Sequence, residues 1–448
     1  MPAAGATARV VWRSPVTVAA VWRATAYYTG LDLAASADAR RLVAVWRTRD
    51  DVYAAASADS GATWSTPVTV NAAPCSGALL DAPRVAASTD GGRAVIVFTC
   101  GAETQGPALF AATSADGGRT WAAATRLSEA TWGTQDLNPV VAVSADGSRA
   151  IAAWDFDPYA SSDPVGNRIQ ASSSVDGGAT WSTPSDIDAY GTSRSIRDLQ
   201  LAASVAGDRV TLLWRSFSYS SGGPAEVRYA TTLDSGTTWG PAATLTVAEG
   251  AWFVRSAASQ DGTRLTVAWS AWNGSHGVLT AATSSDTGGT WTVPVRVSAK
   301  TQDVPTAALW SSASGQRLSL AWTWRSGSRS KAVLSASSRD GGRTWTTPTT
   351  LSLPKRQAKV PSVAASGDGR RVYVAWEQAD GGSWPAYART SVDGGRTWTA
   401  RVRLSPRGGV GGTPQLAVTP NGARATAVWA FSNESRYAIQ SSRGRLVG

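Results

Sequence analysis

Residue types that build many catalytic and metal sites are scarce in this 448-residue chain. It contains one histidine, His276, and two cysteines, Cys75 and Cys100. Without a second histidine or a cysteine cluster, we expect no metal, no cofactor and no histidine-based triad. No run of about 18 apolar residues occurs, so no membrane span is expected either.

Lysine is also rare, and the formal charge of +10 comes almost entirely from arginine. Such a charge attracts anionic partners, for example acidic glycans or nucleic acid. The place of these arginines within the sequence repeats, described below, argues against a nucleic-acid partner.

The most prominent feature of the chain is repetition. A motif of the form Ser/Thr-x-Asp-x-Gly-x-x-Trp, an Asp box, occurs seven times, with neighbouring tryptophans 52 to 60 positions apart. Its Asp can accept bonds from backbone N–H groups, its Gly can take a positive φ, and its Trp can bury a large ring. The motif therefore predicts a tight turn between two antiparallel strands. The seven aspartates are Asp59, Asp116, Asp176, Asp234, Asp286, Asp340 and Asp393.

A second pattern occurs eight times. In each copy a Ser or Thr stands ten positions before an aromatic residue, with an Asp-Gly-like turn between them. The copy predicts a strand, a turn and a second strand. The eight pairs are Ser36/Trp46, Ser88/Phe98, Ser144/Trp154, Ser204/Trp214, Ser259/Trp269, Ser312/Trp322, Ser366/Trp376 and Thr419/Trp429.

Together the two patterns predict four strands in a unit of about 50 residues, which is the signature of a propeller blade. Eight hairpins predict eight blades. The eighth Asp box is missing, but residues 11–18 match the end of such a motif, and residues 437–442 match a third strand without a fourth. We therefore expect an all-β, eight-bladed β-propeller with four antiparallel strands per blade.

The ring is expected to close by pairing of the N-terminal strand with the C-terminal blade. An open array and two smaller rings are the alternatives, and the absence of a linker-like stretch argues against two rings. The expected single domain is residues 1–448, with blades at about 31–70, 81–127, 137–187, 197–245, 253–297, 303–351, 359–404, and 412–448 plus 9–18.

This strand order places two classes of loop on opposite ends of the ring. The Asp boxes and the hairpin turns share one face, the Asp-box face. The loops from second to third strands and between blades share the other, the loop face, where function is more often found. An arginine follows every hairpin turn, so much of the charge is expected on the Asp-box face as solvated turn residues, with a polyanion-binding ring as the alternative.

Aromatic and arginine side chains of the loop face are the candidate ligand-binding residues. Aromatic rings on loops can stack on sugars or anchor a protein partner, although ordinary packing at blade ends is the alternative. Arginines just before the inner strands are expected to face the channel. The candidates are Trp22, Tyr27, Tyr28, Trp132, Trp252, Trp272, Trp324, Trp384, Arg84 and Arg255.

Cys75 and Cys100 fall on the loop face of the same repeat. A disulfide between them is expected, with two buried free thiols as the alternative. A disulfide favours an extracytoplasmic protein. The first residues lack a basic and then apolar signal peptide, but a secreted chain whose leader had been removed would look the same.

The Asp boxes resemble the BNR repeats of sialidases and sialidase-like propellers, over nearly the whole chain. The resemblance implies the architecture rather than an activity, because sialidases are typically six-bladed and Asp boxes stabilise turns away from the catalytic face. A sialidase needs three carboxylate-binding arginines, a Tyr nucleophile with a Glu, and an Asp. The family's Phe/Tyr-Arg-Ile-Pro motif is absent, and its nearest counterpart, Trp12-Arg13-Ser14-Pro15, falls in an outer strand. Glu377 with Tyr387, or Glu434 with Tyr437, are the candidate Tyr–Glu pairs.

We therefore expect a secreted, monomeric, non-catalytic propeller that binds a glycan or glycoconjugate through the loop face, with no catalytic residues. A sialidase-type glycoside hydrolase acting at the channel mouth and a protein-interaction scaffold are the alternatives. An arginine cluster beside a Tyr–Glu pair would favour the hydrolase, and a large flat apolar patch would favour the scaffold.

Overall fold

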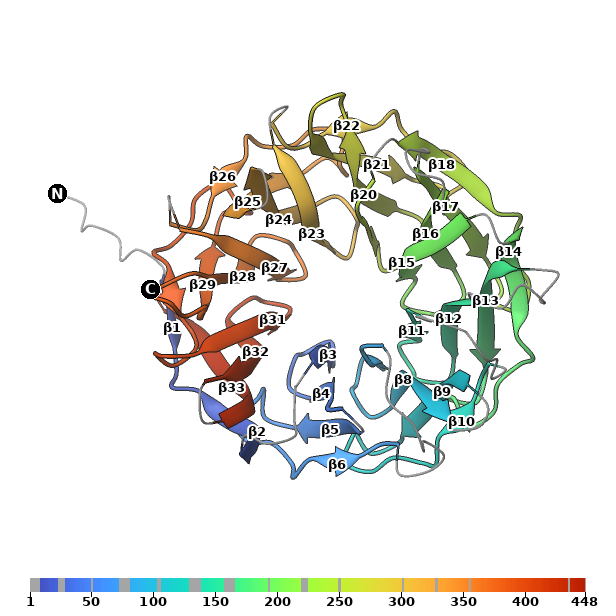
Figure 1. Cartoon of the computed structure of the whole chain (residues 1–448), viewed down its shortest axis with the longest axis horizontal. Coiled ribbons are helices and arrows are strands. Elements are labelled where there is room, and N and C mark those ends of the chain that lie inside the picture. The colour runs from blue at the N-terminus through green and yellow to red at the C-terminus, as the bar shows by residue number, and fades with distance from the viewer. Residues whose placement is uncertain are drawn as a thin grey trace.

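The computed structural model is an eight-bladed β-propeller, as the repeats predict (Figure 1). The structure describes residues 9–22, 29–49, 51–71, 81–102, 106–128, 138–156, 166–191, 194–218, 225–248, 251–299, 302–326, 329–353, 356–433 and 436–447. Over these residues all the regular elements are strands, and they form eight antiparallel sheets around a central channel. No helix long and apolar enough to cross a membrane occurs in this part of the chain.

Each blade begins with an inner strand beside the channel and ends with an outer strand. The inner strands are β3 (Thr29–Ala35), β7 (Arg84–Ala87), β11 (Val140–Val143), β15 (Arg194–Ala203), β19 (Val254–Ala258), β23 (Asp303–Ser311), β27 (Ala358–Ala365) and β31 (Val410–Val418). The second strands are β4 (Leu42–Arg47), β8 (Ala94–Ala102), β12 (Ala150–Phe156), β16 (Val210–Ser218), β20 (Leu265–Trp272), β24 (Leu318–Ser326), β28 (Val372–Gln378) and β32 (Arg424–Ser432).

The third strands lead into the Asp boxes in the first seven blades. They are β5 (Val52–Ser57), β9 (Gly106–Ser114), β13 (Asn167–Ser174), β17 (Ala225–Thr232), β21 (Gly277–Ser284), β25 (Arg329–Ser338), β29 (Ala386–Ser391) and β33 (Arg436–Val447). The outer strands of blades 1 to 7 are β6 (Val68–Thr69), β10 (Thr125–Arg126), β14 (Ser185–Gly191), β18 (Ala243–Ala248), β22 (Val295–Arg296), β26 (Thr349–Thr350) and β30 (Val402–Arg403).

The repeated aromatic residue of each second strand forms the core between neighbouring blades. Six of the eight are fully buried, and Trp46 and Trp269 are 1% exposed. Replacing one such tryptophan with alanine would cost about 3–5 kcal/mol. The second sequence pattern therefore marks the residues that hold the blades together.

The seven Asp boxes fold into the same hydrogen-bonded turn. In blade 1 the Ser57 hydroxyl donates to Asp59 Oδ1 at 2.9 Å, and the Gly61 N–H donates to Ser57 Oγ at 2.8 Å. The Thr63 N–H and hydroxyl donate to the two Asp59 oxygens at 2.9 and 2.7 Å. Equivalent bonds occur in the other six boxes. Every carboxylate is therefore committed to its own turn.

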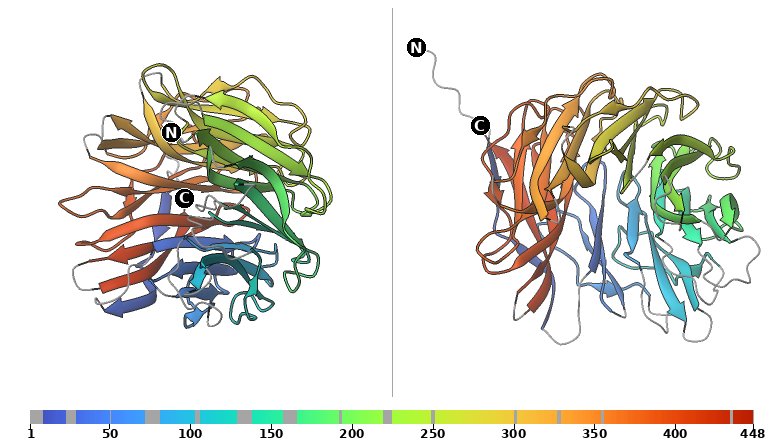
Figure 2. Two further views of the ribbon diagram at one scale, coloured as in Figure 1. Left: turned by 45° about the vertical axis from the view of Figure 1, so that its right-hand side comes forward. Right: turned by 45° about the horizontal axis from the view of Figure 1, so that its top comes forward.

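The eighth blade takes its outer strand from the other end of the chain. Strands β1 (Arg9–Trp12) and β2 (Val16–Trp22) both pair with β33, so the outer strand is broken in two. Figure 2 shows the blue N-terminal strands against the red C-terminal strands. The third strand does not stop at Ser442, as its sequence suggested, but continues to Val447 because no Asp-box turn interrupts it.

A ring of backbone hydrogen bonds joins neighbouring blades on the Asp-box face. The residue after the repeated Ser or Thr donates its N–H to the carbonyl oxygen of the equivalent residue in the next blade. The seven bonds run, in order, through Ala37, Thr89, Ala145, Val205, Gln260, Ala313, Gly367 and Pro420, at 2.6 to 3.4 Å. Pro420 has no N–H, so the bond from blade 8 to blade 1 cannot form.

Other contacts hold this last junction. The Thr426 hydroxyl of blade 8 donates to the Ser60 carbonyl of blade 1 at 2.7 Å, and the Trp64 indole N–H donates to Ser441 Oγ at 2.9 Å. The side chains at the first Asp box thus replace the missing backbone bond.

Acid should weaken the Asp-box turns. The hydroxyl and N–H of Thr290 and the Ser284 hydroxyl lower the pKa of Asp286 to about 2. A carboxyl whose pKa is lower in the folded protein adds stability above its unfolded pKa and loses it as the pH falls through its folded pKa. We expect the unfolding free energy, measured by urea denaturation, to decrease from about pH 4 to about pH 2. An Asp286→Asn variant should lose part of this dependence, and a flat profile in the wild type would contradict the prediction.

The contribution of the inter-blade backbone hydrogen bonds to stability can be tested by removing one more of them. Val205→Pro removes one N–H donor at a position where Pro420 is the natural residue of blade 8. We expect the unfolding free energy to fall by about 1 kcal/mol, the net value of one hydrogen bond. Val205→Ala is the control, and equal stability of the two variants would show that the ring bond contributes nothing.

Candidate functional site

All eight blades contribute to one cavity at the loop-face end of the channel. The inner strands start at the loop face, and their first residues line a cavity of about 670 Å³. Its charged and amide side chains are Asp32, Arg84, Asn138, Arg197, Asp198, Gln200, Arg215, Arg255 and Gln415. These positions differ from blade to blade, unlike the repeated residues around them.

A bulge at the start of the inner strands places several of these side chains. The pairing register shifts there in five blades, for example between Arg197 and Gln200 in blade 4. Asp198 lies inside this shift with a φ of 59°. A bulge turns side chains away from the regular alternation of a strand. Gly30 occupies the equivalent position in blade 1, where a Cβ atom would lie 2.5 Å from Ala82.

Asp198 organises two of the arginines. Its Oδ2 lies 3.1 Å from Arg215 Nε, and its Oδ1 lies 3.9 Å from Arg255 Nη1. Arg215 also donates to the Ala251 carbonyl at 2.7 Å. Arg255 donates to the carbonyls of Ala307 and Val254 at 3.0 and 2.6 Å. Both guanidinium groups are therefore held in place before any ligand arrives.

Arg84 faces this group from blade 2. It is exposed, and none of the described residues forms a hydrogen bond or ion pair with its guanidinium. Burial lowers the pKa of Arg255; Asp198 opposes this shift and the positive charge of Arg84 adds to it. Asp32 forms no ion pair with Arg84 among the described residues, and its two oxygens accept the N–H groups of Leu33 and Val85. The site carries an excess of positive charge.

Two buried carboxyl groups support the rim of the cavity. Asp155 Oδ2 accepts a bond from Asn138 Nδ2 at 3.3 Å and lies 3.7 Å from Arg197 Nη1. Burial raises the pKa of Asp155 well above its usual range, although Arg197 opposes the shift. Burial also raises the pKa of Glu377, whose Oε1 accepts the Thr413 N–H at 2.8 Å.

The candidate aromatic residues separate into different environments. Trp252 lines the cavity, with the Arg325 guanidinium 4.7 Å from its ring centre. Lys359 Nζ lies 4.5 Å from the Trp384 ring, so one face of each of these rings is occupied by a cation. Trp272 is 39% exposed, whereas Trp324 is half-buried and packs in the core of blades 5 and 6.

The expectation that all these aromatics lie in loops is wrong for three of them. Trp22, Trp272 and Trp324 belong to strands β2, β20 and β24, because the strands extend further towards the loop face than the pattern suggested. Tyr27, Tyr28 and Trp132 lie outside the described residues, as does the side chain of Trp22.

The candidate Tyr–Glu pairs are not supported by the described residues. Tyr387 donates its hydroxyl proton to Asp380 Oδ2 at 2.8 Å, and Glu377 is bound by Thr413 and Lys359 instead. Glu434 lies outside the described part of the chain. Arg13 lies beside β33 in the break between the two halves of the outer strand, β1 and β2, away from the channel cavity.

The cysteine pair is described only in part. Cys100 is buried and takes part in a disulfide. Cys75 lies outside the described residues, so the bridge between the two remains a prediction. Within the described ranges, no group of three His, Cys, Asp or Glu side chains is arranged to hold a metal ion.

Three residues that line the cavity were not predicted from the sequence: Asn138, Arg197 and Asp198. Asp198 and Asn138 stand six positions before the repeated Ser, where blade 1 has Gly30. Gly, Asn and Asp are the residues that most readily accept a positive φ. That shared residue type at one offset was the available signal for the bulge.

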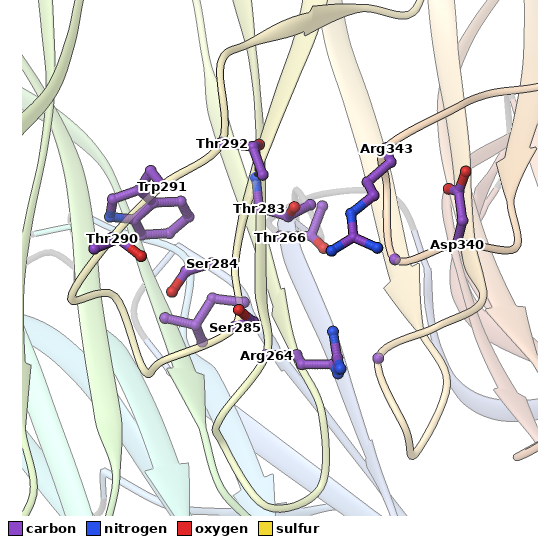
Figure 3. A pocket seen from close by; sticks show the side chains of 13 residues that line it. Arg264, Thr266, Thr283, Ser284, Ser285, Thr290, Trp291, Thr292, Asp340 and Arg343 are labelled. Carbon is purple, nitrogen blue, oxygen red and sulfur yellow. Dashed lines mark hydrogen bonds between the residues drawn. The ribbon is translucent and has the colours of Figure 1, made fainter.

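A smaller pocket of about 150 Å³ lies on the Asp-box face between blades 5 and 6 (Figure 3). Figure 3 shows Arg264 and Arg343 near the turn that carries Asp340, with Trp291 on the opposite, left-hand side of the pocket. These are hairpin and Asp-box residues of the repeat. The channel cavity, lined by residues that do not repeat, is therefore the candidate site.

The family comparison agrees with the repeat structure. A model described as a BNR repeat-like domain matches residues 52–303 and 168–379. No curated protein matches the sequence.

Solved structures with a similar fold share little sequence with this chain. An ulvan lyase, a polysaccharide lyase of family PL25, has a TM-score of 0.50 at 13% identity, covering 84% of this chain and 96% of its own. The GH93 α-L-arabinofuranosidase of Fusarium graminearum has a TM-score of 0.45 at 11% identity, covering 82% and 92%. The NanB sialidase of Streptococcus pneumoniae has a TM-score of 0.41 at 10% identity, covering 93% of each chain.

One assignment follows from the seven Asp boxes of the eight-bladed ring and from the family match over more than half of the residues. The chain belongs to the BNR repeat-like domain family, and it folds as a β-propeller.

Proposed function

We propose that this protein is an exported, non-catalytic propeller that binds an acidic carbohydrate at the loop-face end of its channel. The observation that carries the proposal is the convergence of Arg84, Arg197, Arg215 and Arg255 on one cavity. Guanidinium groups bind carboxylate and sulfate groups through two parallel hydrogen bonds. Arg84 has no carboxylate partner among the described residues, so it is available for a ligand anion.

The size and walls of the cavity suit a sugar. Its volume of about 670 Å³ lies within the range of small-molecule sites. Trp252 supplies an aromatic ring in the wall, and Gln200 and Gln415 supply amides that can bond to hydroxyl groups. An acidic sugar would place its anion between Arg84 and Arg255 and its ring against this wall.

The relatives by fold act on carbohydrates. The ulvan lyase was also solved with the unit -[GlcA(1-4)Rha3S]- bound, which carries a uronic acid and a sulfate. At this level of identity the likeness concerns the fold alone. The arginine-lined cavity gives an independent reason to place an acidic glycan here.

The environment of the carboxyl groups favours binding without turnover over hydrolysis. A glycosidase needs two carboxyl groups free to flank the scissile bond, or a Tyr–Glu pair in a sialidase. Asp155 and Glu377 are buried and bonded to neighbours, and Asp198 is engaged by two arginines. No tyrosine is among the described residues that line the cavity. The cavity is lined by two carboxylates, Asp32 and Asp198, and these are engaged by backbone N–H groups and by arginines respectively, which favours binding over hydrolysis.

A protein-interaction scaffold is also less well supported. Trp272 is the one large aromatic residue that is exposed among the described residues, and the other exposed apolar side chains are aliphatic and scattered over many blades. Export from the cytoplasm is supported by the disulfide at Cys100, since disulfides persist in oxidising compartments.

The proposal predicts a charge-specific binding defect. Arg84→Gln and Arg255→Gln should each weaken the binding of uronic-acid or sialic-acid oligosaccharides by about tenfold or more, because each removes a charge-assisted hydrogen bond. Isothermal titration calorimetry measures the effect, with Arg40→Gln on the Asp-box face as the control. Neutral oligosaccharides should bind weakly to all four proteins.

Two results would contradict the proposal. If the wild type binds no acidic glycan, the carbohydrate assignment fails. If a reducing-sugar or fluorogenic sialoside assay shows turnover that Arg84→Gln abolishes, the protein is an enzyme and the non-catalytic part fails.

A further inference from the structure

Blade 8 differs from the other blades on the Asp-box face. In blades 1 to 7 the third strand ends in an Asp box, which brings one carboxylate to that face. In blade 8, β33 runs on to Val447 and pairs along its end with β32 on one side and β1 on the other. A three-stranded ribbon therefore stands where the other blades have an acidic turn.

The ribbon has an apolar side. Val10, Ala425 and Tyr373 are buried together, with Trp12 and Leu446 packed against them. Tyr373 belongs to β28, so this side of the ribbon covers blade 7. The alternation of side chains along a strand places the intervening residues on the opposite side.

That opposite side is rich in arginine. Arg445 pairs with Arg424 of β32 and with Val11 of β1, so the three side chains form one cross-strand row on the same face. Arg443 lies in the next row, opposite Thr426, and its carbonyl accepts the N–H of Arg13, the residue that follows the end of β1, at 2.8 Å. Arg9 extends the face along β1. We call the face formed by Arg9, Arg13, Arg424, Arg443 and Arg445 the basic ribbon face.

The charges of the basic ribbon face are not neutralised within the described chain. None of its five arginines forms an ion pair with a described residue, and four are exposed while Arg443 is half-buried. Arg424 and Arg445 are direct cross-strand neighbours, an arrangement that like charges disfavour. The first Asp box adjoins this face at Thr426, and both oxygens of Asp59 are bonded to Ser57 and Thr63 there. Residues 1–8 contain no acidic side chain.

This face is different from the rest of the arginine ring. Several hairpin arginines pack their stems against the turn glycine of the next blade, as Arg93 does at Gly147 and Arg264 at Gly315. Arg40 and Arg370 lie beside aspartates of their own turns. Arg424 is itself the hairpin arginine of blade 8, but the other four residues of the basic ribbon face belong to neither a hairpin turn nor an Asp box.

We propose that the basic ribbon face is a second binding surface, for an anionic polysaccharide that carries sulfate or carboxylate groups. On an antiparallel ribbon the backbone positions that carry these side chains are spaced by about 5 Å across strands and about 7 Å along them. A charged chain can therefore meet several of them at once, and the contacts add through multivalency. The surface is separate from the channel cavity, because it lies on the Asp-box side of blade 8.

The composition of the face favours a polysaccharide over other polyanions. It has no aromatic side chain on which a nucleic-acid base could stack, since Trp12 points to the apolar side. Val11 is its one exposed apolar residue beside the arginines, which is too little to enter a lipid bilayer. Arginine binds planar sulfate and carboxylate groups through two hydrogen bonds.

The test compares two variants of equal charge. The first is R13Q/R424Q/R445Q on the basic ribbon face. The control is R40Q/R119Q/R370Q, which removes three exposed arginines that lie beside turn aspartates. Binding of heparin and of polygalacturonate is measured at low ionic strength, with neutral dextran and duplex DNA as further probes.

We expect the ribbon variant to bind heparin at least about tenfold more weakly than the wild type and the control to change by less than about twofold, since contact charges matter more than net charge. Thermal unfolding of the ribbon variant should occur no lower than in the wild type, because the Arg424–Arg445 repulsion is removed. It should also retain the binding of short uronic-acid oligosaccharides by the channel, which separates this surface from the proposed function.

Three results would overturn the proposal. Equal losses in the two variants would show that only net charge matters. Tighter binding of duplex DNA than of either polysaccharide would make the surface a nucleic-acid site. Failure of the folded wild type to bind heparin and polygalacturonate would show that the face binds no polysaccharide.

Discussion

The closure of the ring is the constraint on which the rest of this structure depends. Each blade buries the aromatic residue of its second strand against its neighbour, so no blade is complete until the eighth meets the first. Seven backbone bonds join the hairpin turns in a circle, and the circle is open only where Pro420 meets Ala37. At that junction the N-terminal strands pair with β33, and the first Asp box bonds to blade 8.

Closure also separates the two faces of the molecule. The Asp-box face repeats because every turn performs the same task, with each aspartate committed to the Ser and Thr of its own box. The loop face carries no such repeated turn, and the residues at the starts of the inner strands differ from blade to blade. The exception on the Asp-box face is blade 8, where borrowing the outer strand removes the acidic turn and leaves Arg424 beside Arg445.

Local sequence patterns were sufficient to predict the repeated parts of the fold and some of the residues of the candidate site. Arg84 and Arg255 stand four positions before the repeated Ser, and this offset alone placed them at the channel. The bulge that turns Asp198 into the cavity was missed, because a register shift depends on the partner strand as well as on the residue. Trp324 was taken as a loop residue, but packing between blades 5 and 6 made it part of the core.

By itself the sequence determined the number of blades, the Asp-box turns and the completion of the last blade by a strand from the N-terminal end of the chain. These features follow from spacing and from turn chemistry, which act over a few residues. Only the tertiary structure decided which charges meet. Arg84 and Arg255 come from blades 2 and 5 and interact across the channel, and Asp198 of blade 4 holds Arg255 of the next blade. Such contacts depend on the curvature of the closed ring, which brings distant residues together and which no local pattern encodes.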